Sequence, residues 1–314
     1  MIIKTTEQLR NFISVNGSVN IDNLKPSLRK AERNFLKPLI GLKQITVFEQ
    51  EQTNPILKHA QELAQEAVAN FAYYLYLPVG AVKISDAGIL VVESENSKQA
   101  SDKQFKELQR SFKKSAHEAL DELLDYMEQS ADKFIDWFNS DYYTVYKELL
   151  VNKTITFNKF YYIFNSRQTF VAMMPTIRIV EDQFIKSVIG NNLLEDLKNN
   201  QTIQERKEVK EYLQQSIVAF TIMKTVDNGM FVLDARGIHM KFDVLPYEKS
   251  VTNVNQKVND FLIRTKRNKQ LAGEEYLKMA KDIIIENATV FPEFKIKPVR
   301  NNLKLTVTKG IVGF

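Results

Sequence analysis

The sequence predicts a mainly α-helical protein with a minor β component, built from two tandem copies of a helical-bundle unit, each with a short β-hairpin. Three observations lead to this fold class. A long segment occurs twice, apolar residues recur at helical spacing, and each copy contains two short β-type runs separated by a turn that ends in glycine. We place helical repeat 1 at residues 1–149 and helical repeat 2 at residues 150–314.

The duplication is clearest where residues 24–41, LKPSLRKAERNFLKPLIG, are compared with residues 173–190, MMPTIRIVEDQFIKSVIG. Identical residues continue at the same offset as far as residue 92. The register then changes, so that Glu118 aligns with Glu275 and Phe134 with Phe291. The apolar positions of the first copy are Leu24, Leu28, Ala31, Phe35 and Leu39. Their spacing places them on one face of a helix, and we expect the final glycine to end that helix.

Each unit is expected to follow the same order of elements. An extended lead-in precedes a helix that Thr5 or Thr6 caps in the first unit. The duplicated helix follows, then a polar connection, a long helix, a hairpin and a long amphipathic helix. The last three are expected at about 55–77, 82–92 and 102–138, and again at about 203–226, 231–242 and 253–287, with extra residues near 243–260 and a strand-like tail at 303–307.

Composition limits the class of protein. Of the 314 residues, 44% are hydrophobic and 26% are charged, which is typical of a globular protein. The absence of cysteine excludes disulfides and thiolate metal sites, and fits a chain made in a reducing cytoplasm. We expect neither secretion nor a membrane span, because no apolar run is long enough. The net charge of +5 permits contact with nucleic acid or an acidic protein surface without requiring either.

No pattern in the sequence predicts a catalytic, cofactor-binding or metal-binding site. The three histidines, His59, His117 and His239, lie in unrelated contexts without partners at metal-ligand spacing. The acidic residues at 118–125 are interpreted as a solvated helix face. Glycine-rich phosphate loops and nucleophile motifs are absent from the sequence. We therefore expect a protein that is not an enzyme and needs no cofactor.

The most distinctive polar positions are an arginine and a glutamate, three residues apart, that occur in both copies. An intrahelical ion pair would explain them, and so would a salt bridge between repeats or between subunits. These residues and the apolar positions beside them form a stripe next to the main apolar face. The candidate inter-repeat or subunit contacts are Arg29, Glu32, Leu36, Ile40, Arg178, Glu181, Ile185 and Ile189.

Two basic helical segments, residues 103–114 and 264–269, are a second candidate surface. They could contact phosphates, although neither is interleaved with aromatic residues as in single-strand binders. A solvated face or a contact with an acidic protein explains them equally well. The candidate contacts to DNA or to an acidic partner are Arg264, Lys266, Arg267 and Lys269.

The chain also resembles a known class of proteins. The segments AERNFLKPLIG and LAQEAVANFAYYLYLP resemble the core of phage head–tail connector (adaptor, or neck ring) proteins. More specifically, the chain is similar to uncharacterised virion-module proteins of phages of Bacteroidetes-type hosts. The segments that carry this similarity are LKPSLRKAERNFLKPLIG at 24–41, ISDAGI at 84–89 and NSRQTFVAMMPTIRIVEDQFI at 165–185. The common connector is a single unit, whereas this chain carries two.

The resemblance implies a structural virion protein that joins the portal to the tail around the DNA channel. Its partners would be the portal protein, a further neck or tail protein and other copies of itself in a ring. Twelve chains, or six two-unit chains, would match a twelvefold portal. Assembly in the bacterial host cytoplasm, with no membrane contact and at most non-specific contact with DNA, would follow. The alternative is a nucleic-acid-binding protein that uses the basic helices.

Overall fold

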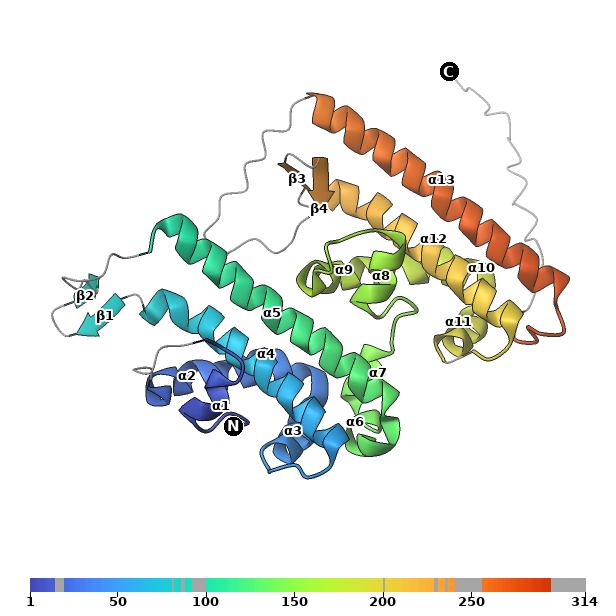
Figure 1. Cartoon of the computed structure of the whole chain (residues 1–314). Coiled ribbons are helices and arrows are strands. Elements are labelled where there is room, and N and C mark those ends of the chain that lie inside the picture. Colours follow the sequence, from blue (N-terminus) through green and yellow to red (C-terminus); the bar gives the residue numbers. More distant parts are fainter. Residues whose placement is uncertain are drawn as a thin grey trace, which may run out of the picture.

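The computed structural model describes residues 1–14, 20–80, 82–85, 88–91, 100–199, 201–228, 231–234, 237–240 and 256–294. Figure 1 shows a mainly helical molecule in which two pairs of long helices, α4 with α5 and α12 with α13, run side by side. The tail expected at 303–307, and residues 243–255 of the expected insertion, lie outside the described residues.

The first unit contains one short helix, a bent helical segment, a pair of long helices and a short helical turn at its end. Its elements are α1 (Thr6–Arg10), α2 (Ile21–Ala31), η1 (Glu32–Leu36), α3 (Lys37–Phe48), α4 (Pro55–Gly80), β1 (Val82–Ser85), β2 (Gly88–Val91), α5 (Asp102–Gln129), η2 (Ala131–Lys133), α6 (Ile135–Phe138) and α7 (Asp141–Tyr146).

The second unit repeats this order as far as its last long helix, α13. Its elements are α8 (Thr154–Phe160), α9 (Arg167–Val180), η3 (Glu181–Ile185), α10 (Lys186–Ile189), α11 (Asn191–Lys198), α12 (Gln204–Asn228), β3 (Phe231–Asp234), β4 (Gly237–Met240) and α13 (Gln256–Glu286). β1 pairs with β2, and β3 with β4, both antiparallel. None of the described helices is long and apolar enough to cross a bilayer.

The first helix begins where the sequence places it. The Thr5 hydroxyl accepts a hydrogen bond from the backbone N–H of Gln8, and the Gln8 side chain accepts one from the backbone N–H of Thr5. This reciprocal capping box satisfies backbone groups that the helix leaves unpaired. The expectation of a threonine cap is therefore confirmed, with Thr5 as the cap.

A π-helical turn interrupts the duplicated helix in both units, at Glu32–Leu36 and at Glu181–Ile185. A π turn accommodates one extra residue, so the face that points to the core moves by one position along the sequence. Beyond it, Leu36 and Ile40 are fully buried in the first unit's core, and Ile185 and Ile189 in the second's.

The π turn overturns part of the site prediction. Leu36, Ile40, Ile185 and Ile189, which the sequence suggested as contacts between repeats or subunits, are at most 2% exposed and pack inside their own units. An uninterrupted helix would have turned these side chains away from the core. Their assignment to an interface is wrong because the turn adds a residue that the apolar pattern does not reveal.

The duplicated glycine redirects the chain in both units. Gly41 has φ +76° and Gly190 has φ +84°, a region that side chains disfavour. Helix α10 ends before Gly190, as expected, but α11 begins directly after it, and α3 likewise continues past Gly41. The polar connection expected at this point is thus largely a second short helix.

Each unit buries its own core. One cluster of buried side chains runs from Ile2 to Trp137, and the other from Leu149 to Phe291. A retained aromatic stack marks the same place in both. Phe35 stacks on Phe71 with centroids 3.9 Å apart, and Phe184 stacks on Phe220 at 4.5 Å. These identical residues were therefore kept for the fold.

Candidate functional site

The two glutamates of the duplicated helix anchor the lead-in of their own unit. Glu32 Oε1 accepts a hydrogen bond from the backbone N–H of Ile2 at 2.7 Å, and Glu181 Oε1 accepts one from the backbone N–H of Leu150 at 2.6 Å. Burial, only partly offset by that N–H and by Lys198, raises the pKa of Glu181 to about 7. The structure thus assigns both glutamates to the folding of their own unit.

The arginines of the duplicated helix differ between the units. Within the described residues, no ion pair joins Arg29 to Glu32 or Arg178 to Glu181, so the intrahelical pair is not observed. Arg178 instead pairs with Glu148. Glu148 lies in the junction segment, which we define as residues 147–153 between α7 and α8. Arg29, at the equivalent place in the first unit, is exposed.

The contact between the units is made by opposite charges. Asp121, Asp125 and Glu128, spaced four and three residues apart, form one stripe along α5. Facing them are basic side chains of the second unit and the junction segment, so the two surfaces are complementary in charge. The ion pairs are Arg167 with Asp121, Lys153 with Asp125, Lys153 with Glu128 at 2.7 Å and Lys147 with Glu128 at 2.6 Å.

These pairs combine buried and exposed partners, since the side chain of Asp125 is 42% exposed. The side chain of Arg167, the first residue of α9, is 8% exposed, and that of Glu128 is 14% exposed. Burial alone would raise the pKa of Glu128, but hydrogen bonds and charges from Lys147 and Lys153 together bring it below its ordinary value. The interpretation of residues 118–125 as a solvated face is therefore wrong for Asp121 and Asp125.

His117 borders this contact as a neutral group. Burial, together with the positive charges of Arg167 and Lys113, lowers its pKa to about 3. Its ring meets that of Phe71 edge to face at 5.0 Å. An imidazole held neutral against an aromatic ring is a packing group, which agrees with the sequence interpretation for this histidine.

The residues of the acidic stripe on α5 differ in part from their equivalents on α13. In the aligned register of α5 and α13, Asp121 corresponds to Lys278, Asp125 to Asp282 and Glu128 to Ile285. Two of the three positions thus change character between copies, although the fold does not. These two changes accompany a difference in surroundings, because the described second unit pairs with α5 and no described unit covers these positions of α13.

The basic segment of α13 is only partly available for a ligand. Arg264 and Arg267 are exposed, whereas Lys266 and Lys269 are half-buried. The Lys269 ammonium lies 5.1 Å from the centroid of the Tyr161 ring, and burial lowers its pKa. The structure therefore separates the four candidate residues into two exposed arginines and two lysines packed against their own unit.

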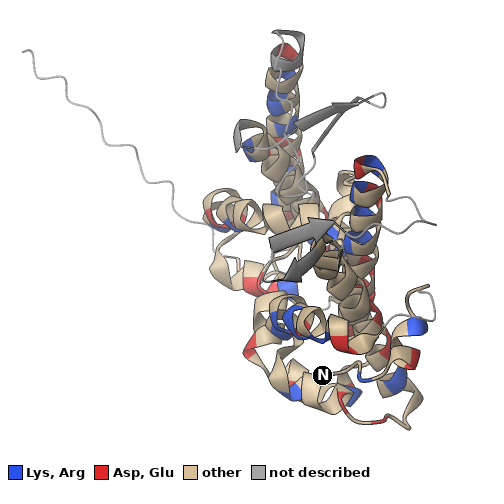
Figure 2. Cartoon of the chain, turned by 90° about the vertical axis from the view of Figure 1, so that its left-hand side faces the viewer, with Lys and Arg blue, Asp and Glu red and all other residues tan. Residues whose placement is uncertain are grey.

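The basic segment of α5 is partly neutralised within its own helix. Its intrahelical ion pairs are Lys106 with Asp102, Arg110 with Glu107 and Lys114 with Glu118. In the view of Figure 2, basic and acidic segments lie on the same helices rather than on separate elements. This pairing favours a solvated face over a phosphate-binding surface for residues 103–114.

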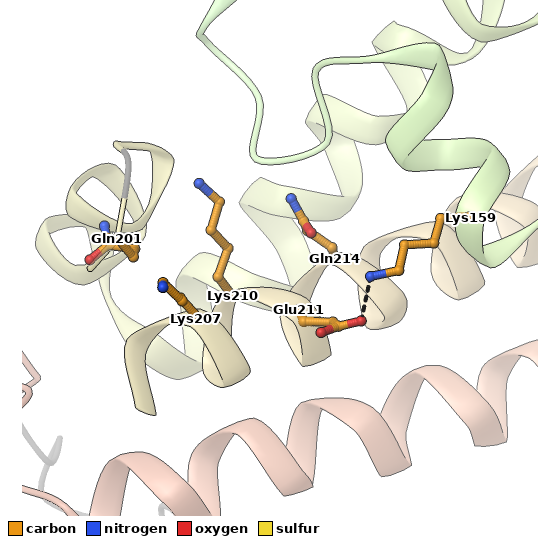
Figure 3. A pocket seen from close by; sticks show the side chains of 6 residues that line it. All are labelled: Lys159, Gln201, Lys207, Lys210, Glu211 and Gln214. Carbon is orange, nitrogen blue, oxygen red and sulfur yellow. Dashed lines mark hydrogen bonds and ion pairs between the residues drawn. The ribbon is translucent and has the colours of Figure 1, made fainter. Parts of the chain in front are cut away.

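One pocket of about 350 Å³ opens beside α12 (Figure 3). The Lys159 ammonium reaches from α8 to Glu211 on α12 at 2.6 Å. Most of the other polar groups hold backbone carbonyls: Gln201 binds that of Asp196 at 2.7 Å and Gln214 that of Leu150 at 3.0 Å. The pocket is lined by Lys159, Gln201, Lys207, Lys210, Glu211 and Gln214.

The first unit shows what this polar lining does. Gln52, equivalent to Gln201, donates to the carbonyl of Val47 at 2.6 Å, and Gln65, equivalent to Gln214, donates to that of Ile2 at 2.8 Å. The glutamines therefore fasten the same backbone segments in both units. Their retention is explained by the fold, and no ligand is needed to account for it.

No group of three His, Asp or Glu side chains within the described ranges is arranged to hold a metal ion. Residues 24–147 and 178–302 each match one protein family, described as a family of unknown function (DUF6712). The chain belongs to this family. The two DUF6712 matches follow one another, so each copy of the duplicated segment corresponds to one unit of the family. No curated protein and no solved structure matches the chain.

The DUF6712 matches also place the inter-unit contact. The first match includes all of α5 with its acidic stripe, whereas the second begins at residue 178, inside α9. Lys153 and Arg167, which meet α5, therefore lie between the two matched stretches. The contact joins one DUF6712 unit to the entry segments of the next.

Proposed function

We propose that this chain is a structural virion protein, a head–tail connector or neck ring component that joins portal to tail around the DNA channel. The virion role rests on the resemblance carried by residues 24–41, 84–89 and 165–185. The proposal is supported by a mainly helical chain of two tandem units, a design that serves assembly. Each unit is proposed to be a helical bundle with a short β-hairpin, as at β1–β2 and β3–β4.

The observation that carries the proposal is how the two units meet. The second unit lies against α5 of the first, and α13 lies at the opposite edge of the molecule (Figure 1). A contact of this kind is heterologous, since it uses different surfaces of two similar units. Heterologous contacts generate rings when the rotation closes, which is the form a connector needs.

A second function, nucleic-acid binding, is favoured by Arg264 and Arg267, which are exposed on α13. Contacts to phosphate give a binding constant that falls steeply with salt concentration. Charge-removing substitutions at these two arginines should flatten that dependence. Full retention of DNA binding in the double variant, or no binding at low salt, would reject this function.

The connector role is tested by assembly with a portal protein encoded in the same genome. The chain should co-purify with the portal as a high-mass species and add a ring to portal particles in negative-stain images. A control portal from an unrelated phage should not retain it. A chain that stays monomeric with its own portal and does not bind it would contradict the proposal.

A further inference from the structure

The surface of α5 that contacts the second unit has an equivalent surface on α13, and that surface is exposed. On α13, the residues equivalent to the acidic stripe of α5 belong to a stripe that we call the α13 outer stripe. It comprises Leu271, Glu275, Lys278, Asp282 and Ile285, all of which are exposed. On α5, by contrast, Asp121, Asp125 and Glu128 are half-buried because the second unit covers them.

We propose that a second copy of this chain docks on the α13 outer stripe through the α1–α2 side of its first unit, head to tail. The docking repeats between chains the contact that α5 makes with the second unit inside each chain. Closure of these contacts into a ring rests on the proposed connector function. The docking of one chain on the next does not, because it requires no portal.

One ion pair of the internal contact can be rebuilt between chains. Lys153 pairs with Asp125, and both residues are retained in the other copy, as Lys4 and Asp282. Lys4 and Asp282 are both exposed. The Lys4 ammonium donates to the carbonyl of Glu49 at 2.6 Å and, having three N–H donors, can donate to a carboxylate as well. Docking in the same manner would bring the Lys4 ammonium of one chain to the Asp282 carboxylate of the next.

The pair formed by Asp121 and Arg167 is not retained at the equivalent positions. Where α5 has Asp121 facing Arg167, α13 has Lys278. In the sequence, the residue equivalent to Arg167 is Ser18, which lies outside the described residues. Both members of that pair therefore change in the sequence, and Lys278 does not have an arginine as its aligned partner.

Charge and apolar surface both favour this occupant. Arg29 stands where Arg178 pairs with Glu148 at the edge of the internal contact, and it is exposed. Opposite charges across an interface steer association and fix its register. The α13 outer stripe offers Glu275 and Asp282 to such basic side chains. It also exposes 55% of Leu271 and 46% of Ile285, which a partner would remove from water.

A repeated contact has a consequence for copy number. If the junction between chains reproduces the junction within a chain, all units become equivalent around the ring. A twelvefold portal would then be matched by six chains of two units, rather than by twelve chains. The alternative of twelve chains would require the two kinds of junction to differ.

Cross-linking tests the docking directly, because the chain has no cysteine of its own. The variant Lys4→Cys/Asp282→Cys is treated with a short bismaleimide. The same reagent is first calibrated on Lys153→Cys/Asp125→Cys, where it should join the two residues within one chain. The expected result for the first variant is a ladder of dimers, trimers and larger species.

A matched control pairs Lys4→Cys with Lys281→Cys, an exposed residue one step around α13 from Asp282. It should give little or no ladder. Absence of a ladder from Lys4→Cys/Asp282→Cys, or an equal ladder from the control, would overturn the docking. Rings that form on a portal without this cross-link would leave the connector role intact and reject only the proposed surface. A ladder from a chain that does not bind the portal would support the proposed surface and reject the connector role.

Discussion

The last long helices of the two units, α5 and α13, occupy equivalent places in the fold but have different surroundings. On α5 the stripe of Asp121, Asp125 and Glu128 is paired with basic residues from the second unit and the junction segment. On α13 the matching residues Lys278 and Ile285 are exposed. The comparison separates two kinds of residue. Identical residues such as Phe35 and Phe184 build the unit. At Asp121/Lys278 and Glu128/Ile285 the change in residue type accompanies the change in what covers the helix.

The largest expected effect concerns residues that are identical in both units. Phe71→Ala and Phe220→Ala each remove a buried ring from an equivalent stack. Each should lower the free energy of unfolding by about 3–5 kcal/mol, because a cavity replaces the ring. Urea denaturation measures both. A large loss in one unit and none in the other would contradict the equivalence of the two cores.

The next effect should be confined to one unit. Asp121→Ala leaves the guanidinium of Arg167 buried without its partner, which should cost about 2–3 kcal/mol. Lys278→Ala, at the equivalent exposed position, should change stability by no more than about 0.5 kcal/mol in the isolated chain. Equal losses in the two variants, measured by urea denaturation, would show that the units do not differ in the way described.

The duplicated glycines should respond unequally to alanine. Both have positive φ, so Gly190→Ala should cost about 1–2 kcal/mol from backbone strain. A Cβ at Gly41 would also come within 2.6 Å of the Tyr142 ring, whereas at Gly190 it would meet nothing within 4 Å. Gly41→Ala should therefore be the more destabilising in thermal unfolding. The opposite order would refute the contact with Tyr142.

The smallest effect is a pH dependence. Burial holds the pKa of Glu181 near 7, above its ordinary value of 4.5, so its contribution to stability is full below pH 4.5 and is lost as pH rises through 7. Glu181→Gln keeps an oxygen to accept from Leu150 and removes this loss. Relative to the wild type, the variant should gain stability between pH 5 and pH 8, on the order of 1 kcal/mol.

Chemical denaturation at several pH values checks this prediction, with Glu32→Gln as the matched control in the first unit. A benefit of Glu181→Gln that shrinks as pH rises would contradict the assignment. So would a benefit that does not change with pH at all.

Local patterns and internal comparison predicted much of the fold. The threonine cap, the long helices and the tandem units follow from spacing, capping chemistry and self-similarity. The helix expected at about 102–138 instead ends at Gln129, and two short helical elements follow it. The π turn does not follow, because apolar residues stand at both Phe35 and Leu36, so either face fits the pattern. The helix after Gly190 is hidden by its polar residues, although Leu193, Leu194 and Leu197 are buried in it. The helix after Gly41 is short and follows a glycine expected to end the helix, although Ile45 and Phe48 are buried in it.

The candidate site was harder to predict, since it depends on contacts between distant segments. Glu32 and Glu181 were recognised as important, but their hydrogen bonds to the backbone of the lead-in cannot be read from helical spacing. The acidic stripe of α5 looks like any solvated helix face until Arg167 and Lys153 are placed opposite it. In the sequence, this contact is indicated by the change from Asp121 and Glu128 on α5 to Lys278 and Ile285 on α13.

The central claim is that the junction inside the chain is repeated between chains. Native mass spectrometry of Asp282→Lys, Lys4→Glu and the double variant, beside the wild type, tests it most directly. The wild type should form higher-order species, each single charge reversal should reduce them to monomer, and the double variant should restore them. A wild type that remains monomeric, or assemblies unchanged by Asp282→Lys, would contradict the claim.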